Sequence, residues 1–131
     1  IGGAGIRALG RQPAETISRE LLGCRFGLMA YDTTRLGKST VFAAYAAHGV
    51  VPVCIGSDGA PVDGLRAGQH LLQPPVSELN VDALRSIQRN LMTWYRGHDA
   101  KALADAVARS CVSGGSESAR HGRSSGAAEA C

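Results

Sequence analysis

The chain has 131 residues, of which 44% are hydrophobic, and this is enough apolar material for the core of one domain. The net charge of +3 is modest and the basic residues are scattered, so a nucleic-acid-binding protein is not indicated. No run of about 18 apolar residues and no signal-peptide pattern occurs, so we expect a cytoplasmic protein without an integral membrane segment.

The first expected elements are a short helix and a strand. Residues 13–22 place a proline where a first helical turn accepts it, and Gly23 ends the segment. Residues 24–31 are mainly apolar and of strand length, and a polar loop follows at residues 32–36. The sequence therefore predicts a strand that leads through a loop into the next helix.

The next segment predicts a buried helix and a second strand. Residues 40–47 (TVFAAYAA) have almost no polar face, and Gly49 ends this helix, where His48 is expected to cap carbonyl groups. Residues 50–55 read as a strand with Pro52 near its beginning. This β-α-β pattern predicts an α/β fold, a partial Rossmann-like domain with parallel strands and crossover helices, whose ligands bind beyond the carboxyl ends of the strands.

The remainder of the chain predicts a loop, two helices and a tail. In the glycine-rich loop, Asp58 and Asp63 are interpreted as turn formers rather than as acid or base groups. Residues 80–96 carry apolar side chains at helical spacing, with Gly97 as the cap, and Asp99 starts a helix through residue 109.

The tail is predicted from its composition. Glycine, serine and arginine dominate after residue 111, so we expect a domain at residues 1–111 and a disordered tail at residues 112–131. A basic arm that uses Arg120, His121 and Arg123 to hold an anionic surface is the alternative for this tail.

The cysteines and histidines do not predict a metal site. No C-x-x-C pair exists, and Cys24 and Cys54 lie in apolar runs suited to buried strands, which favours reduced structural thiols. The histidines also lack the short spacing of zinc ligands. We therefore expect neither a metal nor a cofactor.

The candidate binding site lies at the start of the second helix. A loop after a buried strand brings a glycine, a lysine and two hydroxyl residues to a helix N-terminus, whose free N–H groups favour anions: Gly37, Lys38, Ser39 and Thr40. These residues are predicted to bind a phosphate or diphosphate. The alternative is structural, with Ser39 or Thr40 capping the helix and Lys38 in solvent.

A P-loop is a second interpretation of the same residues. Gly37 to Thr40 copy the end of the G-x-x-x-x-G-K-[ST] motif. Asp32 stands at the position of the first glycine, where a carboxylate opposes the phosphates that the loop has to cradle. A P-loop-like nucleotide-binding protein is therefore disfavoured.

The order of these features resembles a known family over most of residues 9–73. Leu9-Gly10 precedes a short helix, the strand ends at Tyr31, and residues 43–53 give a buried helix, a glycine turn and a Pro-Val strand. A further series follows in order: Gly59, Pro61, Gly64, Gly68 and Leu71-Leu72. The pattern is similar to the C-terminal domain of retaining, glycogen-synthase-like GT-B glycosyltransferases.

The resemblance implies a function and also a departure from the family. It implies a glycosyltransferase that takes a sugar from a nucleotide-sugar donor, with Lys38, Ser39 and Thr40 on the phosphate side and an N-terminal acceptor domain that is missing here. The family's two glutamates would fall near Leu36 and Ala44, neither of which is acidic. The catalytic residues, sugar, nucleotide and acceptor therefore stay unassigned, the fragment is expected to be inactive alone, and a non-catalytic structural or interaction module is the rival.

Overall fold

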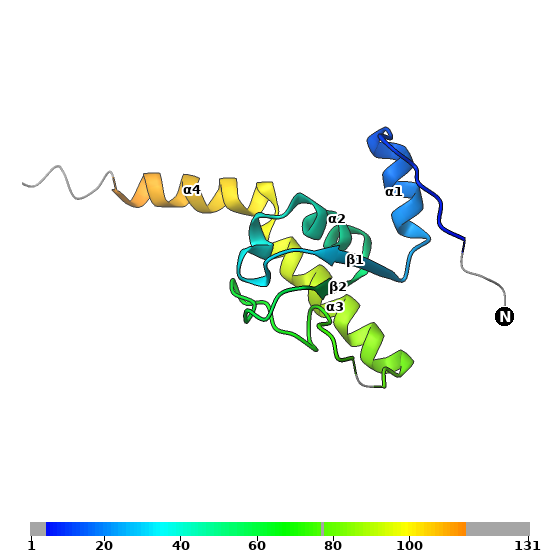
Figure 1. The fold of residues 1–131 in the computed structure, drawn as a ribbon. Coiled ribbons are helices and arrows are strands. Elements are labelled where there is room, and N and C mark those ends of the chain that lie inside the picture. The colour runs from blue at the N-terminus through cyan, green and yellow to red at the C-terminus, as the bar shows by residue number, and fades with distance from the viewer. Residues whose placement is uncertain (1–4, 77, 115–131) are drawn as a thin grey trace, which may run out of the picture. The chain divides into compact units, whose positions relative to one another are not determined.

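The structure is a computed structural model that describes residues 5–76 and 78–114 (Figure 1). Two compact units make up the chain, Ile1–Arg96 and Gly97–Cys131. The elements, in order, are α1 (Ala14–Leu22), β1 (Phe26–Ala30), the 3₁₀ helix η1 (Thr33–Lys38), α2 (Thr40–His48), β2 (Val51–Ile55), α3 (Val81–His98) and α4 (Ala100–Gly114).

The centre of the first unit is a parallel β-α-β arrangement. β1 pairs with β2 in parallel, with Phe26 opposite Val51 and Ala30 opposite Ile55, and α2 is the connection between them (Figure 1). The predicted parallel strands and crossover helix are thus confirmed, and the fold is mixed α/β. A sheet of two strands is too small to define a Rossmann-like domain, so that finer assignment is not established by the fold.

Pro52 is accommodated by the alternation of β2. The Val51 N–H donates to Arg25 O at 3.0 Å, so the nitrogen of the next residue faces away from β1. On that far side the Pro52 carbonyl accepts from Leu72 N at 2.8 Å, while Cys54 N donates to Leu72 O at 2.9 Å. The missing N–H of proline therefore costs the β1–β2 ladder nothing.

α2 is held by caps at both ends and by the burial of two of its side chains. Ser39 Oγ accepts from Phe42 N at 3.2 Å, and Gly49 ends the helix in the left-handed conformation with φ 67°. Phe42 and Ala46 are fully buried in the main core, which also contains Met29, Leu36, Cys54, Leu65, Leu71 and Leu91. The helix is less buried than its nearly uniform apolar sequence predicted, because Val41 and Ala47 are exposed.

Tyr45 packs against β1 at a glycine. A Cβ atom on Gly27 would lie only 2.4 Å from Tyr45 Cε2, so the tyrosine ring occupies the space that a side chain would need. The Tyr45 hydroxyl donates to Leu28 O at 3.3 Å, and burial raises the pKa of this hydroxyl. Gly27 therefore allows α2 to approach the sheet closely.

α3 begins at a side-chain cap and contributes to two apolar clusters. Asn80 Oδ1 accepts from Ala83 N at 2.7 Å. Leu91 joins the main core, whereas Ile87 packs in a second cluster with Val51 and Leu72. The predicted cap at Gly97 is wrong, because α3 runs through that residue to His98.

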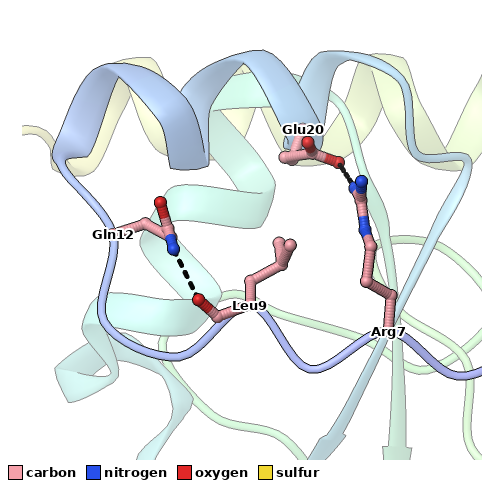
Figure 2. Close-up of polar contacts among 4 residues, drawn as sticks. All are labelled: Arg7, Leu9, Gln12 and Glu20. Carbon is pink, nitrogen blue, oxygen red and sulfur yellow. Dashed lines mark hydrogen bonds and ion pairs between the residues drawn. The ribbon is translucent and has the colours of Figure 1, made fainter.

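The segment before β1, which includes α1, makes polar contacts within itself and with the end of α2. Arg7 Nη2 lies 2.8 Å from Glu20 Oε2, and this ion pair joins the N-terminal segment to α1 (Figure 2). Within that segment, Gln12 Nε2 donates to the carbonyl of Leu9. α1 itself has no buried residue. Its Ser18 hydroxyl lies 2.7 Å from Nε2 of His48.

His48 behaves as predicted at the end of α2. Its Nδ1 lies 2.7 Å from Ala44 O, in hydrogen-bond contact with a carbonyl of the last helical turn. The imidazole therefore joins the last turn of α2 to α1, which the sequence alone did not indicate.

The second unit contains α4. Asp99 Oδ1 accepts from Ala102 N at 2.7 Å, which confirms Asp99 as the start of this helix. α4 continues to Gly114, three residues beyond the boundary predicted after residue 111. The rest of the predicted tail, with Arg120, His121 and Arg123, lies outside the described residues.

Candidate functional site

A pocket opens where β1 ends and α2 begins. Its volume is about 260 Å³, and it is lined by the last residues of β1 and the first residues of α2: Met29, Ala30, Tyr31, Lys38, Ser39, Thr40 and Val41. The carboxyl end of a parallel strand is where ligands of open α/β sheets bind. Three of the four predicted phosphate-site residues, Lys38, Ser39 and Thr40, therefore come together in one pocket.

The backbone at the start of α2 leaves donors available. Ser39 uses its hydroxyl to accept from Phe42 N and its carbonyl to accept from Ala43 N, the latter at 3.0 Å. The N–H groups of Thr40 and Val41 precede these and have no carbonyl one turn earlier to bind. Both residues line the pocket, so the first turn of α2 and the positive end of the helix dipole lie at its wall.

Lys38 adds a full positive charge to this wall. It is the last residue of η1, its side chain is exposed, and in the described part of the chain it makes no ion pair. Ser39, in contrast, is almost fully buried and caps α2, as the structural alternative predicted for it. An anion in the pocket would thus meet one ammonium group and two backbone amides.

Gly37, the fourth residue of the predicted phosphate site, lies against a loop aspartate. It does not line the pocket; instead, a Cβ atom there would lie 2.6 Å from Asp63 Oδ2. Asp63 itself has φ 60°, in the left-handed region, and its carbonyl accepts from Trp94 Nε1 at 2.8 Å. Gly37 therefore makes room for a loop aspartate, and Asp63 sits in a turn as expected.

Hydroxyl groups link the loops that follow the two strands. The buried Thr33 contacts Ser57 through its N–H at 3.2 Å and through its hydroxyl at 2.9 Å, and the same hydroxyl donates to Gly59 O. Gln73 Nε2 donates to Ser57 O at 3.2 Å. Sequence reasoning missed this network, although Thr33 and Ser57 each follow a predicted parallel strand and so belong to the same edge of the sheet.

The loop before the pocket does not form a P-loop cradle. Asp32 caps η1, since its Oδ1 accepts from Thr34 N at 3.0 Å and from Thr34 Oγ1 at 2.7 Å. These hydrogen bonds lower the pKa of Asp32. The N–H of Arg35 donates to Asp32 O and that of Ser39 to Leu36 O, so 3₁₀ turns use amides that a P-loop would direct at phosphates.

Leu36 and Ala44 stand where the resembled family has its two glutamates, and both pack within the fold. Leu36 is fully buried in the main core, and Ala44 is half-buried on α2, where its carbonyl contacts His48. A carboxylate at position 36 would be desolvated without a partner. The described residues thus place no acidic group at either of these positions.

The remaining chemistry of the described residues is sparse. They contain no group of three or more His, Cys, Asp or Glu side chains placed to hold a metal ion. Cys24, Cys54 and Cys111 are free thiols; Cys54 is buried as predicted, which raises its pKa to about 11, whereas Cys24 lies before β1 and is exposed, so its predicted burial is wrong. Among residues 5–76 and 78–114, no helix combines the length and apolar character needed to cross a membrane.

Comparison with known proteins identifies no relative. The chain matches no known protein family, no curated protein and no solved structure. The assignment of function therefore depends on the pocket and on the chemistry of its residues.

Proposed function

We propose that the pocket at the start of α2 binds the diphosphate of a nucleotide sugar, and that the chain is a donor-side part of a glycosyltransferase with a Rossmann-like domain. One observation carries the proposal: Lys38 and the first two residues of α2 line a single pocket at the carboxyl end of a parallel strand. Phosphate oxygens are the anions that such helix starts bind best.

The chemistry of the pocket fits the diphosphate of a donor and an adjoining apolar part. The Thr40 and Val41 amides donate in fixed directions, while the flexible Lys38 ammonium supplies charge to whichever oxygens project outward. Met29, Ala30 and Tyr31 also line the pocket and can contact the less polar part of a donor. Metal assistance is not part of the proposal.

A single wall does not enclose a reacting sugar. Transfer needs groups that stabilise the departing diphosphate and exclude water, and the proposed pocket offers only one side of such an enclosure. We therefore expect an acceptor-binding domain to close the pocket from the other side and expect the chain alone to bind a nucleotide without transferring sugar.

The test is a titration of the chain with UDP, GDP and ADP, followed by the backbone NMR signals of Thr40 and Val41. We expect saturable shifts at these amides, and a Lys38→Ala variant should bind about tenfold more weakly because one charge-assisted contact is lost. Lys101→Ala is the matched control, since Lys101 lies on α4 and pairs with Asp105 at 3.1 Å. Unchanged amides at millimolar nucleotide, or equal effects of both substitutions, would reject the proposal.

A non-catalytic module is the second candidate, and the buried Leu36 favours it. Where the resembled family has an acidic side chain near the sugar, this chain has a core residue, so binding could persist without catalysis. The experiment that separates the glycosyltransferase from the non-catalytic module measures release of UDP from UDP-sugars by the longest natural form of the protein. Nucleotide binding without any such turnover would favour the module.

A further inference from the structure

A second pocket lies at the opposite, amino-terminal end of β1. Its volume is about 190 Å³, and its lining comes from the residue before β1 and from the first turns of α3: Arg25, Val81, Leu84, Arg85 and Gln88. All of these belong to the first unit. The pocket is therefore distinct from the one proposed to bind a nucleotide.

Two guanidinium groups of this pocket are available to a ligand. In the described part of the chain, Arg25 has no hydrogen-bond or ion-pair partner for its side chain. Arg85 Nη1 lies 3.9 Å from Asp82 Oδ1, and the two side chains are 70% and 93% exposed. An ion pair this long and exposed contributes little free energy, so the Arg85 guanidinium is available to bind a more highly charged anion.

The backbone around these arginines is well anchored. Arg25 O accepts from Val51 N at 3.0 Å, which joins the base of Arg25 to β2. Gln88 Nε2 donates to Gly49 O at 2.9 Å and ties α3 to the turn before β2. Leu84 packs against the cluster of Val51, Leu72 and Ile87, so both arginines extend from fixed positions.

We propose that this pocket binds a small phosphate dianion, either inorganic phosphate or the terminal group of a phosphomonoester. Two guanidinium forks match the charge and the oxygen geometry of such a dianion. The volume of about 190 Å³ accommodates the phosphate group of such a ligand. The first turn of α3 adds a favourable dipole, while Asp82 opposes the anion.

The test uses inorganic phosphate and glycerol phosphate at constant ionic strength, with the side-chain N–H signals of Arg25 and Arg85 as the readout. Both probes should shift these signals saturably. Arg25→Ala and Arg85→Ala should each weaken binding about tenfold, because each removes a charged donor. Asp82→Asn should strengthen binding, since it removes a repelling carboxylate next to Arg85.

The controls separate this site from general charge effects and from the nucleotide pocket. Arg89→Ala removes an exposed arginine of α3 that does not line the pocket, and Lys38→Ala alters only the other site; both should bind phosphate at Arg25 as the wild type does. Backbone spectra of each variant check that it is folded. Chloride at the same ionic strength is the reference anion. The proposal would be overturned if chloride shifted the Arg25 and Arg85 signals as much as phosphate does, or if folded Arg25→Ala and Arg85→Ala bound phosphate with wild-type affinity.

Discussion

α2 and α4 begin in the same way but are held by different forces. Ser39 caps α2 and Asp99 caps α4, each by accepting from a backbone N–H three residues later. Phe42 of α2 is fully buried, whereas Leu103 and Val107 of α4 are 65% and 56% exposed. A cap and good helix formers are thus sufficient to mark where a helix begins, but burial against a sheet decides how strongly it is held.

The largest expected effect comes from removing the buried aromatic ring of α2. Phe42→Ala should destabilise the first unit by about 3–5 kcal/mol, because it opens a cavity beside Trp94, whose ring centroid lies 5.5 Å from that of Phe42. Leu103→Ala on α4 should change stability by less than about 0.5 kcal/mol. Urea unfolding followed by Trp94 fluorescence measures both.

Because Phe42→Ala could leave too little folded protein, Phe42→Leu serves as a milder version. It should cost about 1–2 kcal/mol. Equal costs at positions 42 and 103 would show that α4 is held as firmly as α2 and would contradict the comparison.

A smaller effect is expected from adding one methyl group to a glycine. Gly27→Ala should destabilise the first unit by about 1–3 kcal/mol, since the new Cβ would meet the Tyr45 ring at 2.4–2.8 Å. Gly97→Ala in α3 has open space and a helical backbone, and should stabilise by about 0.5 kcal/mol. Thermal unfolding by circular dichroism gives the two shifts.

A substitution of Tyr45 tests the cause of the Gly27→Ala effect. If the clash with the ring is the cause, Tyr45→Leu should recover part of the stability lost in Gly27→Ala. A double variant that is no more stable than Gly27→Ala would assign the loss to the strand instead.

The smallest effects concern the two caps. Ser39→Ala should lower the stability of the first unit by about 1 kcal/mol, because Phe42 N loses its acceptor inside a buried helix start. Asp99→Ala should reduce the helical signal of α4 and leave the cooperative transition of the first unit in place. Hydrogen exchange resolves the two helices, and a shared loss of protection in both variants would contradict their independence.

Periodicity and end signals were enough to predict most helices and strands. The apolar run of TVFAAYAA, followed by Gly49, predicted α2 correctly, and Asn80 and Asp99 marked the starts of α3 and α4. The ends were less well predicted: Gly97 stands inside α3, because a glycine in a helix costs only about 1 kcal/mol and does not by itself end the helix.

The candidate site was predicted in part. Lys38, Ser39 and Thr40 follow a strand and open a helix, and local order alone places them together. The position of Gly37 against Asp63 could not be foreseen, because the two residues come from loops separated by β2. That Arg25 and Arg85 line the same pocket could not be predicted either, because they are 60 positions apart and nothing local links the start of β1 to α3.

By itself, the sequence determined the α/β class, the parallel crossover and the helix start at residues 38–40, because each depends on residues that are neighbours along the chain. The tertiary structure alone decided that Gly27 admits Tyr45, that Leu36 belongs to the core and that Arg25 and Arg85 share a pocket. These outcomes depend on distances between segments remote in sequence, and such distances are set only when the helices pack on the sheet.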